Sequence, residues 1–135
     1  MLAPALTTVR LALHVLAAAV WVGGQLVLVG LLPTARRLGS DVPRTMARAF
    51  ARLAWPAYAV LVATGIWNVT TFHLARQGTA WRAVLGAKLA VVLVAGVASF
   101  AHTRSSRRSA VALWGSLAGL TSVAALCMGI LLAGP

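Results

Sequence analysis

Acidic residues are almost missing from this sequence. Asp41 is the only carboxylate among 135 residues, against 12 lysines and arginines. Paired carboxylates are needed for acid–base hydrolysis, and hard metals such as Mg²⁺ and Ca²⁺ are bound through carboxylate oxygens. Proton coupling inside a membrane commonly uses an aspartate or glutamate within a helix. The sequence therefore excludes carboxylate-based hydrolysis, a carboxylate cage for hard metals and carboxylate-driven antiport.

Cysteine and the glycine motifs of soluble enzymes are also scarce. Cys127 is the single cysteine, which excludes an internal disulfide and any metal motif built on a pair of cysteines. The sequence contains neither a phosphate-binding glycine loop nor a nucleophile elbow. These absences favour a binding or transport role over an enzyme, without deciding between them.

Apolar residues dominate what is present. The chain is 61% hydrophobic and 10% charged, whereas soluble domains have about half apolar and a quarter charged residues. Crossing ~30 Å of hydrocarbon takes ~20 apolar residues in a helix, and a barrel strand takes only ~10. The sequence therefore predicts an all-α polytopic membrane protein: a single membrane domain over 1–135, folded in a lipid bilayer as a four-transmembrane-helix up-down bundle. Its helices are expected near 8–32, 53–74, 81–102 and 110–133.

The positive charge is unevenly placed along the chain. By the positive-inside rule, the arginine-rich first and third loops are cytoplasmic, and both termini lie outside a plasma membrane. The basic residues flank helix ends and have no aromatic residues between them, so nucleic acid is not expected as a partner. The predicted cytoplasmic side has Arg36, Arg37, Arg44, Arg48, Arg52, Arg104, Arg107 and Arg108, and the predicted outer side has Arg10, Arg76 and Arg82.

The segments on either side of the first loop contain patterns that predict where helices begin and end. The N-terminal apolar run continues to Leu32, well beyond the ~7–15 residues of a signal peptide, which predicts a retained helix. Pro33 is expected to end that helix. Further on, Arg44, Arg48 and Arg52 recur every four residues with apolar residues between them. This pattern suits a short interfacial helix on an anionic leaflet, and an ordinary cytoplasmic loop is the alternative.

Glycines and tryptophans give expectations about packing. Gly115 and Gly119 form a small-xxx-small pair, which lets membrane helices approach closely. Trp21 lies midway along the first predicted helix and needs a packing or site explanation. The other four lie near predicted helix ends, where an interfacial belt of aromatic residues is expected: Trp55, Trp67, Trp81 and Trp114.

Two ionisable residues, His14 and Lys88, fall inside predicted helices. Such residues cost a few kcal/mol to insert and are candidates for function. Each lies ~10 Å below the outer surface at 1.5 Å per residue. His14 shares a helix face with Ala18, Trp21 and Gln25, which predicts a polar seam open to the outside. The alternatives are a histidine bonded to a neighbouring helix and a lysine that snorkels to the headgroups.

The other two helices add donor atoms in the same outer half. Thr64 and Asn68 lie on the second helix, and Cys127 and Met128 on the fourth. Imidazole, thiol and thioether together suit copper, above all Cu(I), although cysteine and methionine on an apolar helix often serve packing alone. The candidate copper ligands are therefore His14, Met128 and Cys127. The candidate cofactor-binding residues are His14, Lys88, Trp21 and Asn68.

Three segments resemble a known family of membrane domains. These are LHVLAAAVWVGG, RAFARLAWPAYAVLVATGIWNV and VLGAKLAVVLVAG with a following HTR. Over about residues 10–105 they are similar to the copper-resistance protein D family, which implies a role in copper uptake or tolerance. The pattern also resembles the membrane protoporphyrinogen oxidase of the heme pathway, in which a helix-one histidine and a helix-three lysine correspond to His14 and Lys88.

Three hypotheses follow from these residues. The first is a copper-handling membrane protein with an outer-half site on His14, which binds or transports copper or confers tolerance to it. The second is a b-type heme redox protein or porphyrin oxidoreductase, with His14 as axial ligand and Lys88 paired to a propionate. The third is a structural subunit of a larger membrane complex. A homodimer is compatible with each of them.

Overall fold

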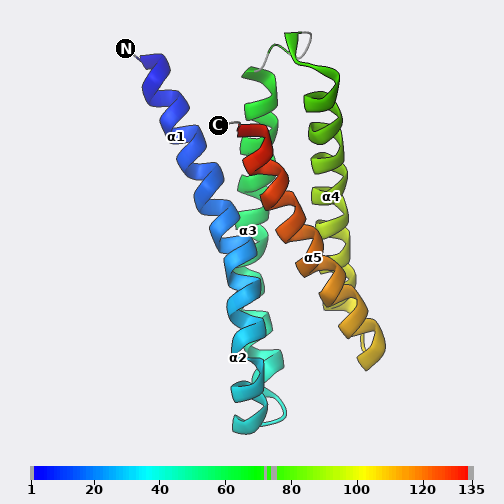
Figure 1. Cartoon of the computed structure of the whole chain (residues 1–135). Coiled ribbons are helices and arrows are strands. Elements are labelled where there is room, and N and C mark those ends of the chain that lie inside the picture. Colours follow the sequence, from blue (N-terminus) through cyan, green and yellow to red (C-terminus); the bar gives the residue numbers. More distant parts are fainter. Residues whose placement is uncertain (1, 72, 74–75, 134–135) are drawn as a thin grey trace. The chain divides into compact units, whose positions relative to one another are not determined.

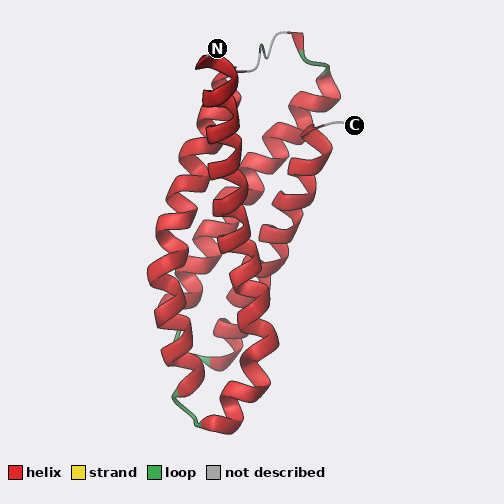
Figure 2. Ribbon diagram, turned by 90° about the vertical axis from the view of Figure 1, so that its left-hand side faces the viewer, coloured by secondary structure: helices red, strands yellow, loops and turns green. Residues whose placement is uncertain are grey.

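The computed structural model describes residues 2–71, 73 and 76–133, and within them it consists of long helices joined by short connections (Figures 1 and 2). Four helical stretches are long and apolar enough to cross a membrane. The prediction of an all-α membrane protein with four long apolar helices is confirmed. The helices in chain order are α1 (Leu2–Ala18), the π-helical turn η1 (Ala19–Gly23), α2 (Gly24–Leu38), α3 (Val42–Thr71), α4 (Thr79–Arg104) and α5 (Arg108–Ala133).

The chain divides into two compact units. The first is Met1–Phe72 and the second is His73–Pro135. Each unit is an antiparallel helical hairpin, as the course of the chain shows (Figure 1). The first hairpin pairs the continuous helix α1–η1–α2 with α3, and the second pairs α4 with α5. Short connections dictate this pairing, because a chain that reverses over a few residues places successive helices side by side.

The first helix does not end at Leu32. Pro33 lies inside α2, which continues to Leu38. A proline removes one backbone hydrogen bond and disfavours helix before it, but it does not forbid a helix held by other contacts. Ala35, two residues beyond Pro33, is buried with 3% of its surface exposed. Packing of this last part of α2 therefore outweighs the local preference of the proline.

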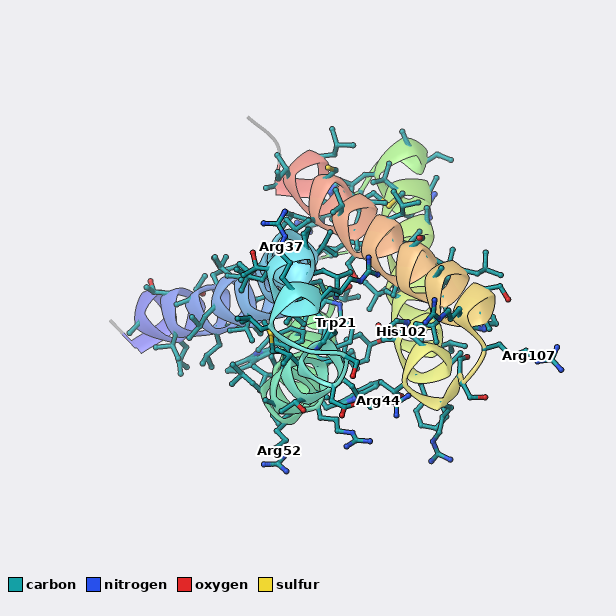
Figure 3. The ribbon with its side chains drawn as sticks, turned by 90° about the horizontal axis from the view of Figure 1, so that it is seen from below. Trp21, Arg37, Arg44, Arg52, His102 and Arg107 are labelled. Carbon is teal, nitrogen blue, oxygen red and sulfur yellow. The ribbon has the colours of Figure 1, made fainter. Side chains whose placement is uncertain are left out.

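The third helix begins earlier than expected. α3 starts at Val42, so the segment that suits either an interfacial helix or a loop is helical and continuous with the membrane span. The first backbone bond of the helix runs from the Thr45 N–H to the Asp41 carbonyl at 3.0 Å. Asp41 thus precedes the helix, where a negative charge is favourable beside the positive end of the helix dipole. The side chains of Arg44 and Arg52 extend from this part of α3 (Figure 3).

An aromatic cluster forms the core of the first hairpin. Trp21 is 4% exposed and packs on Tyr58 and Trp55, with ring centroids 4.6 Å and 5.8 Å away. Val22 and Ala54 are buried beside them. The expectation that Trp55 lies at a helix end is wrong, because α3 begins eleven residues before the predicted start at residue 53. Trp21 accordingly has its packing explanation.

The second hairpin is held together by small side chains. Five of them are buried and let the backbones of α4 and α5 approach closely, which is the usual packing mode in membranes. Trp81, Lys88 and His102 are spaced by multiples of seven residues along α4, and each contacts α5. The buried small residues are Ala95, Gly96, Ala98, Ala118 and Ser122.

The two glycines of the small-xxx-small pair differ in their surroundings. A Cβ on Gly115 would lie 3.0 Å from the His102 ring, whereas one on Gly119 would meet nothing within 4 Å in the described residues. Gly115 therefore makes room for the His102 side chain. Among the described residues of the second hairpin, the expected close approach of another helix is absent at Gly119.

Candidate functional site

Polar side chains line one end of the interface between α1 and α3. A hydrogen bond of 2.8 Å between His14 Nδ1 and Thr64 Oγ1 sets the register of this antiparallel pair. Four residues earlier on α1 and four later on α3, Arg10 and Asn68 form the next level, about 6 Å away at 1.5 Å per residue. On the other side of His14 along the chain lies Trp21, where the aromatic cluster begins. We call Arg10, His14, Thr64 and Asn68 the polar ladder.

The bond to Thr64 sets the tautomer of His14. The Thr64 hydroxyl has one hydrogen, and it donates this hydrogen within its own helix to the Val60 carbonyl at 2.7 Å, with the Leu61 carbonyl at 3.2 Å. The hydroxyl can then only accept from the ring. The hydrogen of the neutral imidazole therefore resides on Nδ1, and Nε2 carries the lone pair. This is the arrangement in which histidine binds a metal, with the second ring nitrogen held by a neighbouring group.

Gly65 lies beside the imidazole. A Cβ at this position would be in ordinary van der Waals contact with His14 Cε1, at 3.5 Å. The sequence pair Thr64-Gly65 thus places a hydroxyl bonded to His14 next to a residue without a side chain. Part of the His14 side chain remains accessible.

A π-helical turn separates His14 from the aromatic cluster. It spans Ala19–Gly23 and contains the buried Trp21. Such turns leave the regular bonding pattern and occur often at functional sites. Here the Gln25 side chain donates to the Trp21 carbonyl at 3.0 Å. A Cβ on Gly24 would overlap the Phe50 ring, so a larger residue at this position would require that ring to move.

Arg10 is the most unusual member of the polar ladder. Its side chain is only 8% exposed, and its Nε has no hydrogen-bond partner among the described residues. The guanidinium lies over the Trp67 ring, with Cζ 5.9 Å from the centroid. Asn68 Oδ1 is buried and likewise has no partner. A donor and an acceptor on facing helices are thus both unsatisfied at one level of the interface.

The energetic cost at this level is large. Removing an unpaired charge from water costs several kcal/mol in proteins, of the order of ten times the thermal energy. A cation–π contact returns about 0.5–2 kcal/mol, which is too little to offset that cost. Each buried polar atom left without a partner adds about 1–3 kcal/mol. Groups this costly are found at functional sites, where a ligand supplies the missing interactions.

Lys88 belongs to the second hairpin, where its side chain packs against α5. Its Nζ lies 3.0 Å from the position that a Cβ on Gly129 would occupy. Gly129 is in the last turns of α5, close to the negative end of the helix dipole, where a cation is stabilised. Trp81 Nε1 approaches the Leu132 carbonyl at 3.4 Å in the same region. The role of Lys88 as a cofactor-binding residue stays a prediction.

The soft donors of the copper hypothesis also belong to the second hairpin. Cys127 is exposed on α5, and Met128 is half-buried. His102 is bound through Nδ1 to the Val111 carbonyl at 2.8 Å, beside the α4–α5 connection. Among residues 2–71, 73 and 76–133, no three histidine, cysteine or acidic side chains gather to hold a metal ion. The copper assignment to His14, Met128 and Cys127 therefore stays a prediction.

Comparison with known proteins returned no relative: no family model, no curated protein and no solved structure matches the chain. What the fold shows is the class, an all-α membrane protein with four candidate membrane-spanning helices. The function has to be argued from the polar ladder itself.

Sequence reasoning identified three of the four ladder residues and missed the role of Arg10. His14 and Asn68 are among the predicted site residues, and Thr64 is among the polar residues of the second helix. Arg10 counted only as an outer arginine in the charge distribution. Its spacing of four residues from His14 was the available signal, because that spacing places both side chains on one helix face.

Proposed function

We propose that this chain is an integral membrane protein that binds a b-type heme or a closely related tetrapyrrole through His14. The observation that carries the proposal is the His14–Thr64 bond of 2.8 Å, which directs the hydrogen to Nδ1 and leaves the lone pair on Nε2. An axial heme ligand needs this nitrogen. When bound, such a heme supplies one-electron redox chemistry, and this chain's residues would hold and orient it.

The number of protein donors supports heme over copper. A heme iron receives four nitrogens from its macrocycle, so one well-oriented histidine is sufficient as a protein ligand. A copper ion needs two to four protein donors, and residues 1–72 contain one histidine, His14, and no cysteine. Copper handling with Met128 and Cys127 remains the second candidate on the strength of the sequence resemblance.

The test is a titration of the purified full chain in detergent with hemin. We expect a Soret band with about one heme per chain and loss of that band in His14→Ala. His102→Ala is the matched control, because it removes an imidazole bonded to a backbone carbonyl in the other hairpin. Free imidazole added to His14→Ala should restore part of the band, since it replaces the missing ligand without refolding the protein.

Other results of this experiment would support copper handling or a structural role instead of heme binding. Stoichiometric copper by elemental analysis, lost in His14→Ala and in a Cys127→Ala, Met128→Leu double variant, would support the copper hypothesis and contradict ours. A chain that binds neither group, but elutes with other membrane proteins, would favour a structural subunit. A homodimer is tested in the same preparation by its mass in detergent.

The proposed orientation places both termini outside the plasma membrane. It is supported by the arginines around the α2–α3 and α4–α5 connections; Arg52 extends away from α3, and Arg107 extends away from the connection between α4 and α5 (Figure 3). The polar ladder would then lie in the outer half of the membrane. A reporter fused to the C-terminus should be active only on the outer side, and activity in the cytoplasm would refute this orientation.

A further inference from the structure

The outer level of the polar ladder has the features of a binding site for an anionic group. Arg10 Nε and Asn68 Oδ1 are both buried and both lack a partner in the part of the chain that the structure describes. They lie opposite one another because the His14–Thr64 bond fixes the register and each is four residues away from it. The guanidinium is held in place over the Trp67 ring at 5.9 Å.

The first hairpin has no anion for Arg10. Its only acidic residue is Asp41, in the connection between α2 and α3. Asp41 is separated from Arg10 by 28 helical residues or more, which corresponds to roughly 40 Å along the hairpin. The aromatic ring of Trp67 provides a weak attraction but no hydrogen-bond acceptor for Nε. An anionic group of a bound molecule would supply the acceptor that Arg10 Nε lacks.

We propose that Arg10 and Asn68 bind an acid side group of the tetrapyrrole, a carboxylate, about one helical turn from its axial ligand His14. This inference rests on the proposed function and names the part of the ligand that the outer level recognises. Arg10 Nε donates to a carboxylate oxygen. Asn68 Oδ1 is an acceptor and does not bind a carboxylate, so the Asn68 amide has to turn its NH₂ toward the same group.

The first experiment varies the ligand and leaves the protein intact. Metal-free protoporphyrin IX and its dimethyl ester are titrated into the full chain in detergent, with tryptophan fluorescence quenching as the readout. The wild-type chain is expected to prefer the free acid by about 100-fold, the size of a buried charge pair that loses one partner. No iron is present, so the result does not depend on ligation by His14. Equal affinities, or no binding of either porphyrin, would overturn the inference.

The second experiment varies Arg10. Arg10→Leu should bind the acid and the ester equally, whereas Arg10→Lys should retain part of the preference because it keeps the charge. Arg52→Leu is the matched control: it removes the same charge from an exposed position on α3 and should keep the full preference. An unchanged preference in Arg10→Leu would place the carboxylate elsewhere.

Two further results separate this inference from its rivals. If Arg10 holds a lipid phosphate, purified wild type will carry bound phosphorus that Arg10→Leu lacks, and the acid and ester will bind equally. Heme that binds through His14 with no acid preference would refute the inference and leave the proposed function intact. A preference for the acid without a His14-dependent Soret band would refute heme ligation by His14 and leave the carboxylate site at Arg10 supported.

Discussion

The two hairpins solve the packing of membrane helices in different ways. α4 and α5 approach through small residues, with Ala98 fully buried and Gly115 making room for His102. α1 and α3 instead enclose large and polar side chains, from the Trp21 aromatic cluster to the polar ladder. Lipid tails supply no hydrophobic drive for helix pairing, so close contact between small residues is the simpler solution.

That difference indicates where function is to be sought. The second hairpin has polar groups too, but His102, Thr103 and Thr121 are bonded to backbone carbonyls. In the first hairpin, Arg10 Nε and Asn68 Oδ1 are buried without partners among the described residues, at considerable cost. Small-residue packing and these bonds account for most of the contact between α4 and α5, whereas packing does not account for the outer level of the polar ladder.

The largest effect on stability is expected from Trp21→Ala. Trp21 is 4% exposed and contacts two other aromatic rings, so its removal leaves a cavity. Because lipid is as apolar as the core, mainly the packing term is lost, and we expect about 3 kcal/mol of unfolding free energy. Trp114→Ala, at a half-buried site on α5, should cost less than half as much. Denaturation in SDS, followed by circular dichroism, measures both, and equal losses would contradict the aromatic-core assignment.

Next in size is the effect of Thr64→Val on ligand binding. The change keeps the shape of the side chain and removes the hydroxyl that accepts from His14 Nδ1. Loss of such a supporting bond lowers affinity by about 10–100-fold. Thr121 has the same kind of bond to its own helix, to the Leu117 carbonyl at 2.6 Å, and belongs to the other hairpin. A hemin titration in which Thr121→Val weakens binding as much as Thr64→Val would refute the role of Thr64.

Ala98→Leu probes the close contact in the second hairpin. Ala98 is 0% exposed, and a larger side chain would force α4 and α5 apart at a cost of about 1–3 kcal/mol. Ala90→Leu, on an exposed position of the same helix, should be nearly neutral. Unfolding in SDS gives both values. If the two variants were equally stable, small-residue packing would not be what holds this hairpin together.

The smallest effect is expected within the Gly115 and Gly119 pair. A methyl group on Gly115 meets the His102 ring at 3.0 Å, so Gly115→Ala should cost about 1 kcal/mol by displacing that ring from the Val111 carbonyl. Gly119→Ala meets nothing within 4 Å and should gain up to about 1 kcal/mol, because alanine favours helix over glycine. Thermal unfolding in detergent measures whether each substitution lowers or raises the stability. The same sign for both would mean that Gly119 has a contact that this hairpin does not show.

Much of the fold follows from the length of the apolar stretches alone. The predicted stretches 81–102 and 110–133 differ from α4 and α5 by two residues or fewer at each end. The errors fall in the first hairpin. Pro33 predicts a helix end that the structure does not have, and the pattern before residue 53 fits a helix and a loop equally well. In both places packing between the helices decides, and a local pattern does not contain that information.

For the site, the sequence by itself singled out His14, Lys88, Trp21 and Asn68, because polar or bulky residues are rare inside apolar helices. The class of protein was determined in the same way, since backbone groups in lipid must bond within the helix. Only the tertiary structure decided which of these residues meet. The register of α1 against α3 pairs His14 with Thr64 and brings Arg10 level with Asn68, whereas Lys88 lies beside Gly129. Register depends on how two faces fit together, and no single helix specifies its partner's face.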